Sequence, residues 1–324
     1  MTRVASVLAI AAPFVFCASG VHAESYPSRP IRLVVAQAPG GQNDAIARML
    51  TQQLSDILKQ PVVIENRGGV GGTIGADFVA KAPADGYTLL VGGSNNLAIA
   101  VAVHPALPYD PARDFVPVRG IAQVPYALAV NAKMPVASVR ELVAYARAHP
   151  GQLTYGSGGN GSTSGLAAEL FKSMAGVDIV QVPYKGSAPA VADLVSGHVS
   201  MMFADLALVL PHAKAGTLRL LAAAGEARAP GAPGLATVAE QGYPGYGISA
   251  WYAVVAPAAT PAAVIAKLDE ALAQTVRSDE LRQRLLQQGY EPIDAPPPVI
   301  GAMIRSDIAK FATLVRSAGI KGEQ

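Results

Sequence analysis

The most informative segment of this sequence is Gly156-Ser157-Gly158-Gly159-Asn160-Gly161-Ser162-Thr163-Ser164, which consists only of glycine, serine, threonine and asparagine. It follows the strand-like Leu153-Thr154-Tyr155 and runs directly into the helical pattern of residues 166–171. A junction of this kind presents unpaired backbone N–H groups, hydroxyl groups and the positive end of a helix dipole. The segment therefore predicts a binding site for one small anionic group, either a carboxylate or a phosphate.

The same segment also matches the dinucleotide-binding pattern G-x-G-x-x-G at Gly156, Gly158 and Gly161. Two observations weigh against that alternative. The acidic residue expected to contact a ribose is missing, because Asp178 falls at the start of the next predicted strand. The N-terminus, in addition, predicts export from the cytoplasm, where dinucleotides are normally made and used.

Residues 1–23 have the pattern of a secretory signal peptide. Arg3 is the only early charge, residues 4–18 form an apolar run, and Val21-His22-Ala23 provides a cleavage site, so the mature chain would begin near Glu24 in the periplasm. A membrane anchor is the alternative, but the run is shorter than the ~20 residues that span a bilayer. Cys17 is the only cysteine, so the mature chain would have neither disulfides nor a catalytic thiol.

Composition limits the remaining classes of function. The chain has 324 residues, of which 51% are hydrophobic and 15% charged, enough for two domains with their own cores. A formal net charge of +2 is too small an excess of positive charge to indicate binding to nucleic acid or to an anionic membrane. The histidines show no metal-ligand spacing, so we expect a soluble protein with no metal and no cofactor.

Short apolar runs alternate with amphipathic stretches, which indicates an α/β fold. Residues 31–36 predict a strand buried on both faces, which the glycine turn Pro39–Asp44 separates from a helix. Near the C-terminus, Tyr246–Pro257 predicts a strand, and Thr260-Pro261 predicts the N-cap and first residue of a helix. The segments Ala122–Tyr126 and Tyr246–Trp251 are the expected crossings between two lobes.

Seven motifs occur in one order along the chain and together carry a family resemblance. They are Pro39-Gly40-Gly41, Glu65-Asn66-Arg67-Gly68, Asp85-Gly86-Tyr87-Thr88-Leu89, Leu107-Pro108-Tyr109-Asp110-Pro111, Asp114-Phe115, Gly156–Ser164 and Val182-Pro183-Tyr184-Lys185-Gly186. In this order they resemble the substrate-binding receptors of tripartite tricarboxylate transporters, the Bug (Bordetella uptake gene) family of periplasmic proteins. The resemblance covers residues 26–320.

The resemblance implies a type II periplasmic-binding-protein fold, in which two α/β lobes joined by two crossing strands close over a small carboxylate. Lobe 1 would contain residues 24–125 plus 248–324, and lobe 2 residues 126–247. The expected partners are the carboxylate and the large and small membrane subunits of the transporter, with the receptor itself a monomer. The resemblance does not identify which carboxylate is bound.

The family's ligand lies between the glycine loops of the two lobes, which places the candidate contacts in this sequence. In lobe 1 they are Ala38, Gly40, Gly41, Asn43, Asp44 and Ser94. The sequence departs from the usual pattern at Gln42-Asn43, where a third glycine and a hydroxyl residue are common. Asn43 could donate and accept hydrogen bonds with the ligand, and it could also be the helix N-cap. Asp44 fits a carboxylate that caps the first helical turn or braces the loop better than a ligand contact, because it would repel an anion.

In lobe 2 the resemblance implies that one end of the ligand contacts Ser157, Asn160, Gly161, Ser162, Thr163 and Ser164. Ser162 is also a candidate N-cap of the following helix. Asp205 follows the predicted strand 201–203, and could accept a hydrogen bond from the ligand or cap the next helix. Trp251 is expected in a core.

Two other functions remain to be compared with a transport receptor. An enzyme is not favoured, because the sequence lacks a G-x-S-x-G elbow and an H-E-x-x-H motif, and we expect no catalytic residue. A receptor that signals through a membrane sensor kinase stays open, because closure of the lobes is the same physical event in both cases.

Overall fold

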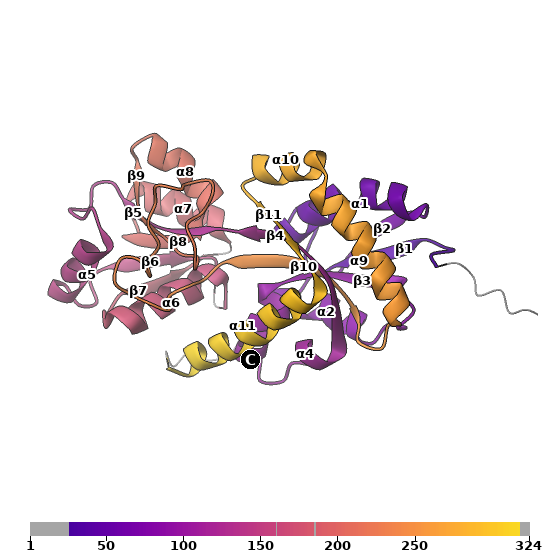
Figure 1. Cartoon of the computed structure of the whole chain (residues 1–324). Helices are drawn as coiled ribbons and strands as arrows, with labels where there is room; N and C mark the ends of the chain where they lie inside the picture. The colour runs from indigo at the N-terminus through magenta and orange to yellow at the C-terminus, as the bar shows by residue number, and fades with distance from the viewer. Residues whose placement is uncertain (1–25, 160, 185, 318–324) are drawn as a thin grey trace, which may run out of the picture.

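The computed structural model describes residues 26–159, 161–184 and 186–317. The chain forms two α/β lobes side by side, each with its own sheet, and strands run between them (Figure 1). The predicted signal peptide, Asn160 and Lys185 lie outside the described residues. The α/β architecture expected from the alternating pattern is confirmed.

Lobe 1 is built on a six-stranded sheet in the order β11-β4-β10-β3-β1-β2. The strands are β1 (Ile31–Val35), β2 (Val62–Asn66), β3 (Thr88–Gly93), β4 (Phe115–Val124), β10 (Ala250–Pro257) and β11 (Glu291–Ala295). The first three run parallel to one another, whereas β10 and β11 pair antiparallel to their neighbours. Because parallel strands end at the same edge of a sheet, the loops that follow β1, β2 and β3 meet there.

Helices cover this sheet and include three from the C-terminal part of the chain (Figure 1). The helical segments are α1 (Gln42–Leu58), η1 (Val70–Gly72), α2 (Thr73–Ala80), η2 (Asn95–Ile99), α3 (Ala100–Val103), α4 (Pro111–Asp114), α9 (Ala262–Arg277), α10 (Asp279–Gln287) and α11 (Pro297–Ser317). Helix α1 packs against α9 and α10, and α11 packs against η2 and β4. The C-terminal elements therefore complete a lobe that the N-terminal strands begin.

A buried ion-pair cluster fastens these C-terminal elements to β4. Arg119 of β4 is only 5% exposed, and its Nε donates to Asp269 of α9 at 2.6 Å. Its Nη1 donates to Asp294 of β11, which also accepts a hydrogen bond from Arg277 at the surface. One guanidinium thus links three elements that are far apart in the sequence.

Lobe 2 contains a five-stranded sheet in the order β7-β6-β8-β5-β9. Its elements are β5 (Tyr126–Asn131), α5 (Val139–Ala148), β6 (Thr154–Ser157), α6 (Thr163–Ala175), β7 (Val180–Pro183), α7 (Ser187–Ser196), β8 (Met201–Asp205), α8 (Leu206–Lys214) and β9 (Leu218–Ala223). Strands β6 and β8 are parallel neighbours, so the start of α6 and the end of β8 lie at one edge of the sheet. That edge faces lobe 1.

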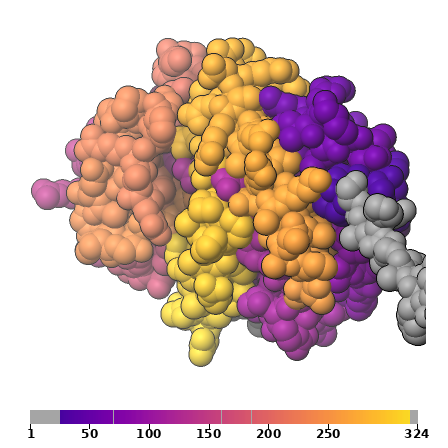
Figure 2. Space-filling model, turned by 45° about the vertical axis from the view of Figure 1, so that its right-hand side comes forward, coloured from indigo at the N-terminus to yellow at the C-terminus, as the bar shows by residue number. Residues whose placement is uncertain are grey.

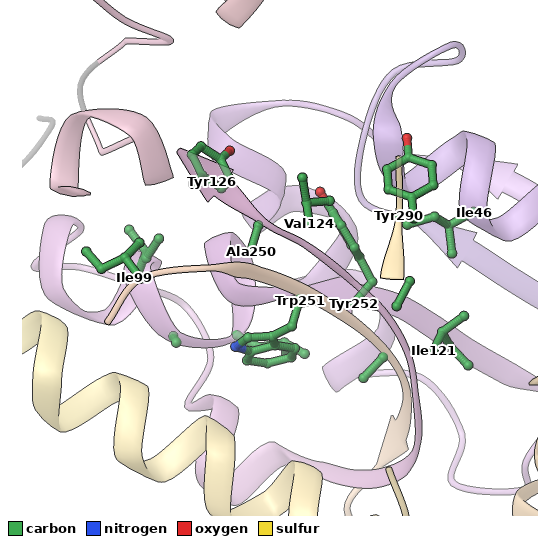
Figure 3. Close-up of a cluster of buried hydrophobic side chains, with 14 of the residues drawn as sticks. Ile46, Ile99, Ile121, Val124, Tyr126, Ala250, Trp251, Tyr252 and Tyr290 are labelled. Atoms are coloured by element: carbon green, nitrogen blue, oxygen red, sulfur yellow. The ribbon is translucent and has the colours of Figure 1, made fainter. Parts of the chain in front are cut away.

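The chain crosses between the lobes at two places. Strand β4 ends at Val124 in lobe 1, and β5 begins at Tyr126 in lobe 2. On the return, the Ile248 N–H donates to Ala224 O in lobe 2, whereas Ala250 pairs with Val124 in lobe 1. The side chains of Trp251 and Tyr252 point to opposite sides of β10 (Figure 3). Trp251 is 1% exposed, which confirms its expected core position.

Several expected boundaries are wrong. Strand β10 begins at Ala250 rather than at Tyr246, because the Tyr246 side chain is anchored in lobe 2 by its hydroxyl bond to Ala167 O. Pro261, not Thr260, occupies the N-cap of α9, and the Thr260 hydroxyl instead donates to Pro257 O. Residues 115–121 of β4 and the edge strand β11 have no counterpart in the sequence-based assignment, which gave only the crossing segment Ala122–Tyr126 there, because neither shows a strong alternating pattern.

Candidate functional site

A small polar hollow lies at the edge of lobe 1 where the loops after β1, β2 and β3 meet. Its volume is about 270 Å³, near the lower end of the ~300–1,000 Å³ typical of small-molecule sites. Its described lining residues are Ala36, Gln37, Ala38, Asn43, Gly69, Gly71, Gly72, Gly93, Ser94, Asn95, Asn96 and Tyr252. None of these carries a charge, so the hollow offers amide, hydroxyl and backbone hydrogen-bonding groups.

A larger hollow of about 690 Å³ lies elsewhere between the lobes. It opens between residues coloured orange in lobe 2 and the yellow helix α11 (Figure 2). Its lining includes the carboxylates of Glu226, Glu291 and Asp307, and Lys310 crosses from α11 to Glu226 and to Gly247 O. The lining also contains the cations Arg228 and Lys310, but the three carboxylates outnumber them, so the uncharged smaller hollow is the better candidate site for an organic acid.

The loop between β1 and α1 is held in place by Asp44. This carboxylate is 3% exposed and accepts hydrogen bonds from Gly40 N, Arg48 Nε and Asn66 Nδ2, each at 2.9 Å. The hydrogen bond from Arg48 is the largest cause that lowers the pKa of Asp44 to about 2. The structure thus gives Asp44 the loop-bracing role, and its contact with a ligand stays a prediction.

The other lobe 1 candidates lie in the same loop or at its rim. Gly41 is the N-cap residue of α1, so the interpretation of Asn43 as the N-cap is wrong. The Asn43 side chain instead contacts Val91 O at 3.4 Å and lines the hollow with Ala38 and Ser94. Gly40 has φ +84°, a left-handed conformation that favours glycine.

The serine hydroxyl groups of lobe 2 are used largely within their own loop. Ser162 is the N-cap of α6, where its Oγ accepts from Gly165 N at 3.2 Å and donates to Gly159 O at 2.7 Å. Ser164 Oγ accepts from Gly158 N at 2.9 Å, and fully buried Ser157 accepts from Gln181 Nε2 at 2.9 Å. The N-cap alternative for Ser162 is confirmed, and Asn160 lies outside the described residues.

Two residues of this loop reach across to lobe 1. Thr163 Oγ1 donates to Asn95 Oδ1 at 3.2 Å, and Asn95 lines the hollow. A Cβ added to Gly161 would lie 3.9 Å from Cβ of Val103 in α3. The first-turn N–H groups of α6, which have no acceptor within the helix, therefore begin beside the hollow of lobe 1.

A third contact between the lobes was missed from the sequence. The Gln42 side chain donates through Nε2 to Asp205 Oδ2 at 3.0 Å and accepts from the Tyr252 hydroxyl at 2.7 Å. Asp205 lies at the N-cap position of α8 but makes no capping hydrogen bond, so the helix-cap alternative is wrong. The only sequence signal was the unusual Gln42-Asn43 pair, which gave no indication of a partner in lobe 2.

We expect Gln42→Ala to weaken ligand affinity about 5- to 10-fold, because it removes a contact made only when the lobes are together. This corresponds to about 1–1.5 kcal/mol, the net worth of one hydrogen bond. Gln52→Ala is the matched control, since Gln52 is exposed on the same helix and its side chain hydrogen-bonds locally to Asp56. Equal affinities of the two variants, measured by calorimetric titration, would show that Gln42 has no role in closure.

A polar hollow in one α/β lobe, facing a second α/β lobe to which crossing strands join it, defines a two-lobed solute-binding protein of the periplasmic-binding-protein fold. Comparison with known proteins supports this class. Residues 46–320 match the family described as tripartite tricarboxylate transporter family receptor. Protein BugT of Bordetella pertussis is 38% identical over 322 residues, which cover 99% of each chain.

Two solved structures with bound acids are similar over nearly the whole chain. R. palustris Rpa4515 with adipate is 40% identical, with a TM-score of 0.78 over 92% of this chain and 100% of that chain. MatC from Rhodopseudomonas palustris with bound malate is 33% identical, with a TM-score of 0.74 over 90% of this chain and 100% of that chain. This protein therefore belongs to the tripartite tricarboxylate transporter family of receptors, as the resemblance to the Bug family predicted.

Proposed function

We propose that this protein is a periplasmic receptor that captures a small organic carboxylate between its lobes and delivers it to the large and small membrane subunits of a tripartite transporter. The observation that carries the proposal is the uncharged polar hollow at the carboxyl ends of β1–β3, opposite the start of α6. No helix in the described part of the chain has the length and apolar character needed to cross a bilayer. The receptor acts as a monomer and releases the acid chemically unchanged.

The chemistry of the hollow supports an acid of small size. Neutral donors and the first-turn N–H groups of a helix can bind an anion without a buried cationic side chain. The desolvation cost of such a side chain is therefore avoided. Charge-assisted hydrogen bonds contribute about 1.5–3 kcal/mol each. A few of them are enough for micromolar affinity after ordering costs. Adipate and malate, which are bound in the two relatives, are of this class.

The proposed contacts are those that the resemblance places in the two glycine loops and at the neighbouring strand ends. They are Ala38, Gly40, Gly41, Asn43, Asp44 and Ser94 from lobe 1, and Ser157, Asn160, Gly161, Ser162, Thr163, Ser164 and Asp205 from lobe 2. The lobes themselves comprise residues 24–125 plus 248–324 and residues 126–247. The crossings at Pro125 and near residue 249 support these boundaries.

The proposal is tested by the thermal stability of the mature protein with adipate, with malate and with hexane-1,6-diol. The diol is the matched control, because it has the length of adipate without the carboxylates. A ligand at 100 times its dissociation constant stabilises the folded state by about 2.7 kcal/mol, so one of the acids should raise the melting temperature by several degrees. Stabilisation by the diol and by neither acid would contradict the proposal, as would chemical conversion of the bound acid.

A further inference from the structure

The Asp205 carboxyl group is buried at the interface between the lobes and has no charged partner among the described residues. It ends β8 and is 4% exposed. Oδ2 accepts its hydrogen bond from Gln42 of the opposite lobe at 3.0 Å, whereas Oδ1 is buried and accepts no well-formed hydrogen bond from the described residues. A buried carboxylate oxygen without a donor is costly, and protonation removes that cost.

The groups that face Asp205 are all neutral near pH 7. They are the amide of Gln42 on α1, the hydroxyl groups of Tyr126 on β5 and Tyr252 on β10, and Tyr290 just before β11. Burial, followed by the nearby Asp205 carboxylate, raises the pKa of Tyr126 and Tyr252 further above the ordinary range of tyrosine. In the described part of the chain, no lysine, arginine or histidine forms an ion pair with Asp205.

This environment exists only when the lobes are together. Gln42, Tyr252 and Tyr290 belong to lobe 1 elements, whereas Asp205 and Tyr126 belong to the sheet of lobe 2. When the lobes part, Asp205 loses its Gln42 donor and gains water, and its pKa returns toward the usual value near 3.9. In this structure, where Gln42 contacts Asp205 across the lobes, desolvation by burial raises the pKa of Asp205, although the hydrogen bonds from Tyr126 and Gln42 partly oppose this.

We propose that closure of the lobes creates a proton-binding site at Asp205, so that the receptor takes up a proton from solution together with its organic acid. The proton would reside on Oδ1, the buried oxygen that accepts no well-formed hydrogen bond from the described residues. Opening of the lobes would return both acid and proton. This inference rests on the proposed function, because ligand binding is what closes the lobes.

The test counts the protons taken up when adipate binds, by calorimetry at pH 6.5 in buffers with different ionisation enthalpies. For each adipate bound, the wild type should take up as much as one more proton than the Asp205→Asn variant. Asparagine keeps the side-chain shape of aspartate but cannot titrate. The wild-type affinity should weaken up to tenfold per pH unit as the pH rises, and that of Asp205→Asn should stay constant. Since all variants bind the same acid, titration of the ligand itself cancels in the comparison.

Glu291→Gln is the matched control. Glu291 is a second largely buried carboxyl group with an oxygen that lacks a hydrogen-bond donor among the described residues, but it lines the larger hollow. It should take up protons as the wild type does. Equal proton counts in the wild type and Asp205→Asn, or a count reduced only in Glu291→Gln, would overturn the inference. Neither result would affect the proposed function, which fails only if no acid binds.

A second measurement keeps the inference testable without a ligand. In a variant whose lobes are joined by a disulfide between Val103→Cys and Gly161→Cys, Asp205 stays buried. A carboxyl group whose pKa is raised by folding favours the folded state below about pH 4, and that advantage is lost as the pH rises. The melting temperature of the locked protein, relative to its Asp205→Asn counterpart, should therefore fall between pH 4 and 7. Parallel curves would overturn the inference.

Discussion

Joining the lobes by a disulfide between positions 103 and 161 is expected to stop the exchange of ligand with solution. A Cβ at Gly161 would lie 3.9 Å from the Cβ of Val103, close to the mean of about 3.8 Å in disulfides. The only cysteine of the sequence is Cys17, in the predicted signal peptide, so the new pair has no competing thiol in the mature chain. Gly161 has φ +70°, which adds about 1–2 kcal/mol of strain for cysteine.

The oxidised Val103→Cys/Gly161→Cys variant loaded with adipate should release it orders of magnitude more slowly than the reduced form, because opening then requires a broken S–S bond. Oxidised without ligand, the variant should fail to bind. The two single-cysteine variants are the controls, and addition of a reductant should restore exchange within the same sample. Fast exchange in a protein with a verified disulfide would show that the acid does not bind between the lobes.

Arg119→Met is expected to lower the free energy of unfolding by about 3–5 kcal/mol. The substitution keeps an apolar side chain of similar length, but it leaves the carboxylates of Asp269 and Asp294 without their shared buried partner. Because these two residues belong to α9 and β11, the loss would loosen the C-terminal elements from β4. Urea unfolding, followed by circular dichroism, measures the effect.

Arg277→Met is the matched control for this prediction. Arg277 binds the same Asp294, but its side chain is 66% exposed, and exposed ion pairs contribute only about 0–1 kcal/mol. Similar destabilisation by both substitutions would contradict the view that the buried guanidinium anchors the C-terminal part of lobe 1. Restoration of much of the lost stability in a triple variant that adds Asp269→Asn and Asp294→Asn would support it.

Much of the local structure could be predicted because its signals are local. The run at residues 31–36, apolar except for Arg32, contains strand β1, in which only Arg32 is exposed, and the segment Gly156–Ser164 leads into α6 with Ser162 as its cap. The N-cap alternative for Asn43 rested on the preference for asparagine at that position and was wrong, because the chain places Gly41 there. Strand β11 was missed because four of its five residues are only partly buried and it pairs with β4 from a distant part of the chain.

The amino-acid sequence by itself determined the family, the two-lobed α/β architecture and the loops that carry the candidate contacts, because periodicity, glycine turns and motif order are properties of neighbouring residues. Only the tertiary structure decided which of those groups face each other. Gln42 and Asp205 are 163 positions apart, and their contact depends on how two separately folded lobes meet. The same is true of the burial of Asp205, since Gln42, Tyr252 and Tyr290 around it belong to the other lobe.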